Sequence, residues 1–137
     1  MIRVLAAVAV AMLFAAAPAS AQMSHGSDHA MSGWKQLDSY HMLMMATWHP
    51  IKDKGELTPL REMVGKMVAS AETLAVSTAP KACATPELKT AAETLVTETK
   101  RVAEMVANKA NDSLLTLAMH NLHEQFEVLE QGCKPAK

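Results

Sequence analysis

Apolar side chains recur at three- and four-residue intervals along four stretches of the chain, with charged or small polar residues between them. This spacing gathers the apolar residues of each stretch on one face of an amphipathic helix. The pattern predicts helices over residues 33–48, 59–79, 86–109 and 112–131. No segment alternates apolar and polar residues as a half-buried strand does. The chain is therefore expected to be all-α.

Short punctuating motifs set the expected ends of these helices. His49-Pro50 is expected to end the first helix, because the residue before a proline disfavours the helical conformation. Gly132 is expected to stop the last helix. A capping side chain followed by proline or by an acidic residue is a typical helix start. Three such starts occur: Thr58-Pro59, Thr85-Pro86 and Asn111-Asp112.

Residues 1–21 predict a secretory signal peptide. Arg3 supplies the positive charge, residues 4–17 form an apolar run too short to span a membrane, and Ala19-Ser20-Ala21 is an A-x-A cleavage signature. Removing these 21 of the 137 residues leaves 116, enough for one domain. We expect an exported protein with no membrane span, periplasmic in a Gram-negative cell.

Four amphipathic helices with short connections have one economical arrangement, an antiparallel up-down-up-down four-helix bundle over residues 33–137. In that order Cys83, in the second connection, lies at the same end of the bundle as Cys133. These are the two cysteines of the chain, and an exported protein favours a disulfide between them. A redox or metal-thiolate pair is the alternative, but it lacks C-x-x-C spacing.

Net charge and the absence of catalytic motifs argue against two classes of function, nucleic-acid binding and catalysis. Removing Arg3 from the 13 basic residues leaves 12 against 14 acidic ones, so nucleic acid is not an expected partner. No G-x-S-x-G, no H-E-x-x-H and no paired carboxylates on an apolar face occur, so no enzyme activity is expected. Methionine is abundant, with 11 copies, whereas aromatic residues make up only 4%.

His41 is the most informative single residue. It lies near the centre of the first apolar stripe and is expected to point into the bundle, where an imidazole needs a hydrogen bond or a metal. Counting along the helices places Met44, Met45 and Met119 in the same half of the core. Thioethers with an imidazole favour Cu(I). The alternative is an ordinary core in which methionine is filler.

The last predicted helix carries His120 and His123, whose three-residue spacing lets two side chains share a helix surface. His123 lies at the flank of the apolar stripe and could reach a site shared with the first helix, whereas His120 is expected to face solvent. Glu124 and Glu127 flank the pair and form either a weak exposed site or a solvated acidic face. His49 is interpreted as a cap of the first helix.

Residues 22–32 have no periodic pattern and are predicted to form a flexible arm. The arm contains His25, His29 and Met31. Its segment Asp28-His29-Ala30-Met31 resembles the D-H-x-M segments of bacterial copper-resistance proteins of the cell envelope. That resemblance implies copper capture by the arm.

The mature chain also looks like the cytochrome c′ and b-type four-helix cytochrome superfamily, especially at Leu122–Glu127 and Gly132–Lys134. It lacks the C-x-x-C-H motif, so covalent haem is excluded. The resemblance implies non-covalent haem b as an alternative. The axial pair would be His41 with Met119, or Met44 with His123. Because such bundles often dimerise, a homodimer is retained as an assembly state.

A second resemblance is to small exported haem-less bundles that carry a His…Trp-His-Pro-x-Lys pattern. The matching residues are His41, Trp48-His49-Pro50 and Lys52. This resemblance implies the bundle fold and a metal-binding role.

The sequence therefore predicts a copper-binding protein for buffering, delivery or sensing, with a metal-exporting or metal-accepting envelope protein as its partner. The alternatives are a haem-b electron-transfer bundle and a metal-free structural or chaperone-like bundle. His41 and His123 are the first expected ligands. The other candidate ligands are Met44, Met45, Met119, His49, His120, His25, His29 and Met31.

Overall fold

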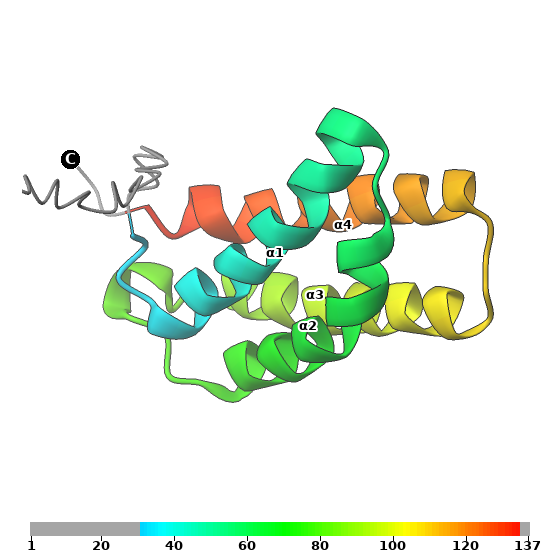
Figure 1. Cartoon of the computed structure of the whole chain (residues 1–137). Helices are drawn as coiled ribbons and strands as arrows, with labels where there is room; N and C mark the ends of the chain where they lie inside the picture. Colours follow the sequence, from blue (N-terminus) through cyan, green and yellow to red (C-terminus); the bar gives the residue numbers. More distant parts are fainter. Residues whose placement is uncertain (1–30, 135–137) are drawn as a thin grey trace, which may run out of the picture.

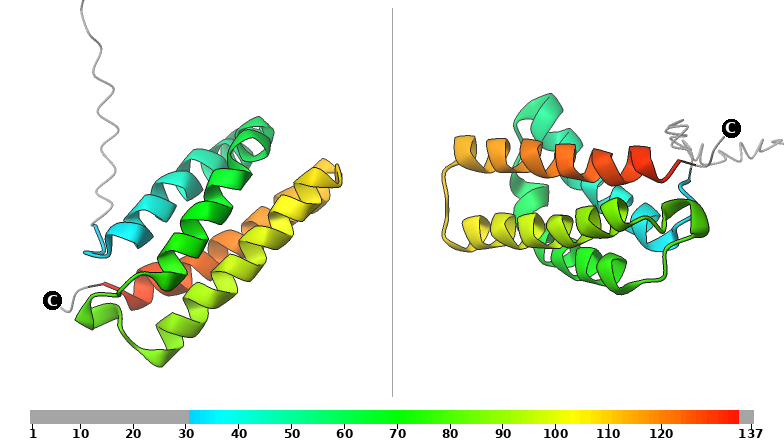
Figure 2. Two further views of the ribbon diagram at one scale, coloured as in Figure 1. Left: turned by 90° about the horizontal axis from the view of Figure 1, so that it is seen from below. Right: turned by 180° about the vertical axis from the view of Figure 1, so that it is seen from behind.

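The computed structural model describes residues 31–134, which form four α-helices and no strand. Figure 1 shows α1 (Lys35–Lys54), α2 (Thr58–Val76), α3 (Pro86–Ala107) and α4 (Asp112–Gly132), with one turn of 3-10 helix, η1 (Lys81–Cys83), before α3. Each helix runs opposite to the one before it (Figure 2). The expectation of an all-helical chain with four helices is confirmed. The predicted leader and residues 22–30 of the arm lie outside the described residues.

The first helix continues past the expected stop at Pro50. It runs to Lys54, with Pro50 inside it and Ile51 buried at 3% exposure. An internal proline costs about 3 kcal/mol, and burying an isoleucine returns about 1.5–3 kcal/mol. Packing therefore offsets much of the cost of Pro50, and the helix continues. The helix instead ends at Gly55, whose left-handed backbone (φ 68°) closes the last turn.

The other helix starts follow the predicted motifs, with one difference. Thr85 accepts a hydrogen bond from the backbone N–H of Leu88, and Asn111 accepts one from that of Leu114. Thr58 is instead the first residue of α2. The N-cap residue is Leu57, and no side chain caps this helix start. The predicted ends of the second and third helices, at 79 and 109, are each two or three residues too late.

The core is made by the stripes that the periodicity predicted. Its largest fully buried side chains come from all four helices: Leu37, Tyr40, Met44, Leu60, Met67, Leu74, Leu95, Leu115, Met119, Leu122, Phe126 and Leu129. Each helix thus covers the apolar stripes of its neighbours, which a single amphipathic helix cannot do alone.

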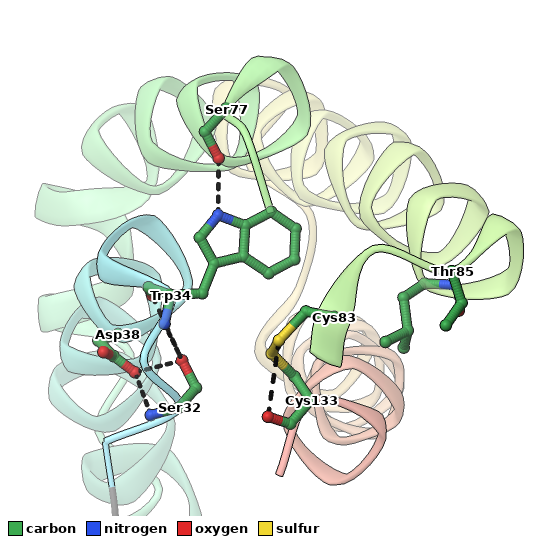
Figure 3. Close-up of a disulfide and its surroundings, with 8 residues drawn as sticks. Ser32, Trp34, Asp38, Ser77, Cys83, Thr85 and Cys133 are labelled. Atoms are coloured by element: carbon green, nitrogen blue, oxygen red, sulfur yellow. Dashed lines mark hydrogen bonds between the residues drawn. A yellow bond between two sulfur atoms is a disulfide. The ribbon is translucent and has the colours of Figure 1, made fainter. Parts of the chain in front are cut away.

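The predicted disulfide is present at one end of the bundle (Figure 3). Cys83 and Cys133 are bonded, with their Cα atoms 4.7 Å apart and both residues buried. Gly132 does not act as the expected left-handed stop, because it remains helical and Cys133 is the C-cap. A Cβ on Gly132 would meet Leu88 Cδ2 at 2.5 Å. The close approach of α3 therefore explains why a glycine occupies position 132.

The start of the described chain is held at this same end. Trp34 Nε1 donates a hydrogen bond to Ser77 Oγ (2.8 Å), which joins the start of α1 to the end of α2 (Figure 3). Ser32 donates to Asp38 Oδ1 from its backbone nitrogen (2.9 Å) and from its hydroxyl (2.7 Å). The point at which the arm leaves the bundle is thus fixed. Within residues 31–134 no helix is long and apolar enough to cross a bilayer.

Candidate functional site

The side chains with metal-binding chemistry gather where α1 meets α4. These two helices touch less extensively than the other neighbouring pairs. We call the group formed by His41, Met45 and Trp48 of α1 and His120 and His123 of α4 the histidine seam. Residues three or four apart on a helix share a face, which puts Met45 on the same face as His41 and Trp48.

Trp48 lies against two imidazoles of α4. Its ring centroid is 5.4 Å from that of His123, with the planes stacked at 29°, and 5.8 Å from that of His120. The indole is buried, the side chain of His123 is 25% exposed, and His120 is exposed. His120 therefore faces solvent as predicted, but it also borders Trp48. The imidazoles of His120 and His123 lie against the indole, where an ion from solution can reach them.

Two carboxylates lie beside His123. Its Nδ1 is 3.8 Å from Glu124 Oε1, and its Nε2 is 3.8 Å from Glu127 Oε1. Both distances exceed those of a hydrogen bond. The carboxylates therefore supply negative charge near the ring without fixing either nitrogen, which favours the approach of a cation.

His41 lies at another level of the seam. Its Nδ1 is 3.2 Å from Glu130 Oε1, and its ring centroid is 5.2 Å from that of Phe126. The side chain is 14% exposed, so it is half-buried at the helix interface rather than enclosed in the core as expected. A carboxylate within reach of one ring nitrogen can orient an imidazole, as is usual for metal-binding histidines.

His41 and His123 do not converge on one position. Seven residues of α1 separate His41 from Trp48, which is the residue that His123 stacks on. Seven residues of helix rise about 10 Å, which is too far for both imidazoles to bind one ion. Among residues 31–134 no group of three or more His, Cys, Asp or Glu side chains is arranged to hold a metal. The seam therefore offers two separate partial sites.

The predicted thioether ligands divide between core and seam. Met44 and Met119 are 1% and 0% exposed, so they are enclosed by apolar neighbours. Met67, also fully buried, accepts a hydrogen bond on its sulfur from the Thr47 hydroxyl at 3.5 Å. Met45 alone of the three predicted helix thioethers is half-exposed and on the seam face.

His49 and the arm residues lie away from this arrangement. His49 does not cap α1, because the helix continues past it. Its exposed ring has Nδ1 3.8 Å from Asp53 Oδ2, one turn further on. Met31 is 71% exposed. His25 and His29 lie outside the described residues.

A buried polar pair crosses the core between α1 and α3, and the sequence analysis missed it. Tyr40 Oη and Thr99 Oγ1 are 2.8 Å apart, and both residues are fully buried. Burial raises the pKa of Tyr40 well above its usual value, and the hydrogen bond with Thr99 offsets only part of that rise. The signal was present, since Tyr40 and Thr99 both occupy stripe positions of their helices.

The residues proposed as axial haem ligands differ in burial, since His41 and His123 are half-buried. Met44 and Met119 are closed into the core. The rings of Trp48 and Phe126 contact imidazoles of the opposite helix, and Trp48 and His120 also line a surface hollow of about 540 Å³. The 520 Å³ pocket beside Trp34 is lined by neither histidine nor methionine.

Comparison of the chain with protein-family models, with curated proteins and with solved structures finds no significant match.

Proposed function

We propose that this chain is an exported protein that binds copper ions as cargo, for buffering, delivery or sensing. The observation that carries the proposal is the His120–His123 pair against Trp48. Two imidazoles three residues apart on one helix can approach one ion together, and the adjacent carboxylates favour a cation.

The chemistry of the seam favours copper over the common hard cations. Imidazole nitrogen and thioether sulfur are ligands that Cu(I) prefers, whereas Ca²⁺ and Mg²⁺ require oxygen. Met45 supplies the thioether on this face, and an indole face can add cation–π attraction to a bound cation. Met44 and Met119 act as core side chains in this proposal, since any ion reaching them would have to displace packed neighbours.

Copper titration of the mature chain tests the proposal. A Trp34→Phe background leaves Trp48 as the only indole of the chain's two tryptophans, so quenching by Cu²⁺ reports on the seam. Replacing both His120 and His123 by Ala is expected to lower copper affinity at least ~10-fold, because even outer-shell partners of metal ligands are worth 10–100-fold. A competition titration with a Cu(I) chelator gives the same comparison for the reduced ion.

Asn121→Ala is the matched control. Asn121 lies between the two histidines in sequence, is exposed, and lines a surface hollow on the α3 side together with Arg101 and Glu98. Its removal should leave copper affinity unchanged. A parent protein that retains no copper after desalting would overturn the proposed function. So would a histidine double variant that binds as tightly as the control.

A further inference from the structure

A pocket of about 520 Å³ opens at the disulfide end of the bundle, away from the histidine seam. Its walls come from Trp34 before α1, from the end of α2, from the connection that contains η1, and from the start of α3. The volume lies within the range of about 300–1,000 Å³ that proteins use to bind small molecules. This pocket has no part in the copper chemistry proposed above.

Two cross-connections hold the walls of this pocket in place (Figure 3). On one side Trp34 Nε1 donates to Ser77 Oγ at 2.8 Å, and the Ser77 hydroxyl donates in turn to the Leu74 carbonyl oxygen at 2.8 Å. On the other side the disulfide fixes Cys83 to Cys133. A pocket whose walls are already ordered has a lower entropic cost of binding.

The walls suit the apolar part of a ligand. Besides the Trp34 ring they are formed by small or rigid apolar side chains: Ala75, Ala79, Ala84, Pro86 and Ala92. The Ser77 hydroxyl already donates one hydrogen bond and accepts another. A polar group of a ligand placed against these walls would lose its bonds to water without replacing them, which is costly. The body of the ligand is therefore expected to be apolar.

The start of α3 gives the pocket one cationic edge. Lys89 is the only charged residue of the described chain that lines the pocket, and it is exposed. Lys100 of the same helix pairs with Glu72 at 2.7 Å, whereas Lys89 forms no ion pair with any residue of 31–134. The positive end of the α3 dipole lies at the same edge. An anionic group is therefore favoured there.

Thr85 adds a hydrogen-bond donor at this edge. Its hydroxyl oxygen accepts the backbone N–H of Leu88 at 3.2 Å, which leaves the hydroxyl proton to donate to an acceptor in the pocket. A carboxylate accepts hydrogen bonds on both oxygens, so it can use the Thr85 hydroxyl and the Lys89 ammonium group together. Apolar walls with one cationic, donating edge match an amphiphilic anion.

We propose that this pocket binds a small amphiphilic carboxylate. Its apolar body lies against the Trp34 ring and the alanine side chains, and its carboxylate group is directed to Lys89 and Thr85. This binding activity goes beyond the proposed copper function and does not depend on it, since the pocket and the histidine seam share no residue. The small lining side chains set the size of the ligand, and Lys89 selects its charge.

Titration of the mature chain with octanoate, followed by ¹H–¹⁵N nuclear magnetic resonance, tests the site. The chain has two tryptophans, and a Trp48→Phe variant assigns their indole signals. The indole N–H of Trp34 should shift and saturate, because octanoate changes the surroundings of its bond with Ser77. The indole signal of Trp48 should not move. No saturable shift of Trp34, or equal shifts of both indoles, would overturn the proposal.

Two lysines provide a matched test of charge selection. Lys89 and Lys66 are both exposed on helices, but only Lys89 lines the pocket. Lys89→Gln is expected to weaken octanoate binding about 2–5-fold, the effect of one exposed ion pair, and Lys66→Gln to leave it unchanged. Binding of 1-octanol, which has the same apolar chain without the charge, should respond to neither change. Equal effects of the two variants on octanoate would contradict the assigned ligand class.

Two alanines test the position of the ligand. Ala75 and Ala103 are both half-buried within helices, but only Ala75 lines the pocket. Ala75→Leu should fill part of the space and remove the Trp34 shift at octanoate concentrations that saturate the parent, whereas Ala103→Leu should bind like the parent. Circular dichroism of both variants checks that the helices are retained. An Ala75→Leu protein that is folded and binds octanoate with the parent affinity would show that the ligand does not occupy this pocket.

Discussion

The buried hydroxyl pair of Tyr40 and Thr99 has a defined direction. The Thr99 hydroxyl donates its one proton to the Leu95 carbonyl oxygen at 2.7 Å. Its oxygen can therefore only accept from Tyr40, so the tyrosine is the donor at 2.8 Å. Ionised Tyr40 could not donate this bond and would be a charge enclosed in the core. Both effects keep the phenol protonated in the folded state.

This arrangement predicts a loss of stability at alkaline pH. Because the folded pKa of Tyr40 lies above its unfolded value of 10.0, its contribution is complete below pH 10 and is lost above it. There the unfolded chain releases a proton that the native protein retains, which lowers the free energy of unfolding by about 1.4 kcal/mol per pH unit. Denaturant unfolding at a series of pH values measures this slope.

Tyr40→Phe is the control for that experiment, since it keeps the ring and removes the titrating group. It should cost about 1–2 kcal/mol at neutral pH and make the decline above pH 10 shallower than in the parent. Tyr40 is the only tyrosine of the chain, so tyrosinate absorbance reports its ionisation directly. Ionisation of the native protein at the pH of free tyrosine would contradict this account.

The helix ends show how the same backbone geometry can be favourable or costly. Gly55 ends α1 in the left-handed region at φ 68°, whereas Lys109, just after α3, adopts φ 53° with a full side chain. Left-handed geometry costs an L-residue about 1–2 kcal/mol, and glycine does not incur this cost. The connection between α3 and α4 therefore carries strain that the one after α1 avoids.

Lys109→Gly is expected to stabilise the protein, by about 1 kcal/mol after allowing for the greater flexibility of glycine in the unfolded chain. The reciprocal change, Gly55→Ala, should destabilise by a similar amount, since its Cβ meets nothing within 4 Å and only the backbone is strained. Denaturant midpoints of the two variants provide the measurement. A destabilised Lys109→Gly protein would show that the lysine side chain makes contacts worth more than the strain.

The sequence predicted the existence and type of each helix better than its ends. Periodicity identifies four helices because every stripe must be buried, and the caps at Thr85 and Asn111 are local and readable. The expected stop at Pro50 was wrong, because the burial of Ile51, the next residue, offsets much of the proline penalty and that burial depends on the other helices. Gly132 was expected to stop the last helix. A glycine is instead favoured there because Leu88 of α3 lies close by, which no local pattern reveals.

At the scale of the whole molecule, the sequence identified candidate ligands but not how they group. The apolar periodicity predicted that His41 and His123 could reach a shared site between the first and last helices, and both do lie between α1 and α4. Their separation along the axis depends on the relative level of the two helices, which periodicity does not contain. The contacts of Trp48 and Glu130 with these imidazoles are likewise long-range. Spacing alone therefore suggested one site where the fold has two positions.

The disulfide fixes one end of the bundle, whereas at the other end an ion pair between Arg61 and Asp112 joins the start of α2 to the start of α4. The disulfide joins Cys83, in the connection before α3, to Cys133 after α4, and encloses both helices in a loop of 50 residues. A cross-link of this span restricts the unfolded chain far more than the folded one, and typically contributes about 2–4 kcal/mol. We therefore expect reduction to lower the free energy of unfolding by that amount while the helices remain folded.

Denaturant unfolding with and without reductant tests this expectation. A double variant with Cys83→Ala and Cys133→Ala should resemble the reduced parent and show no response to reductant, which separates loss of the cross-link from side effects of the reagent. The unreduced, denatured parent should contain no free thiol.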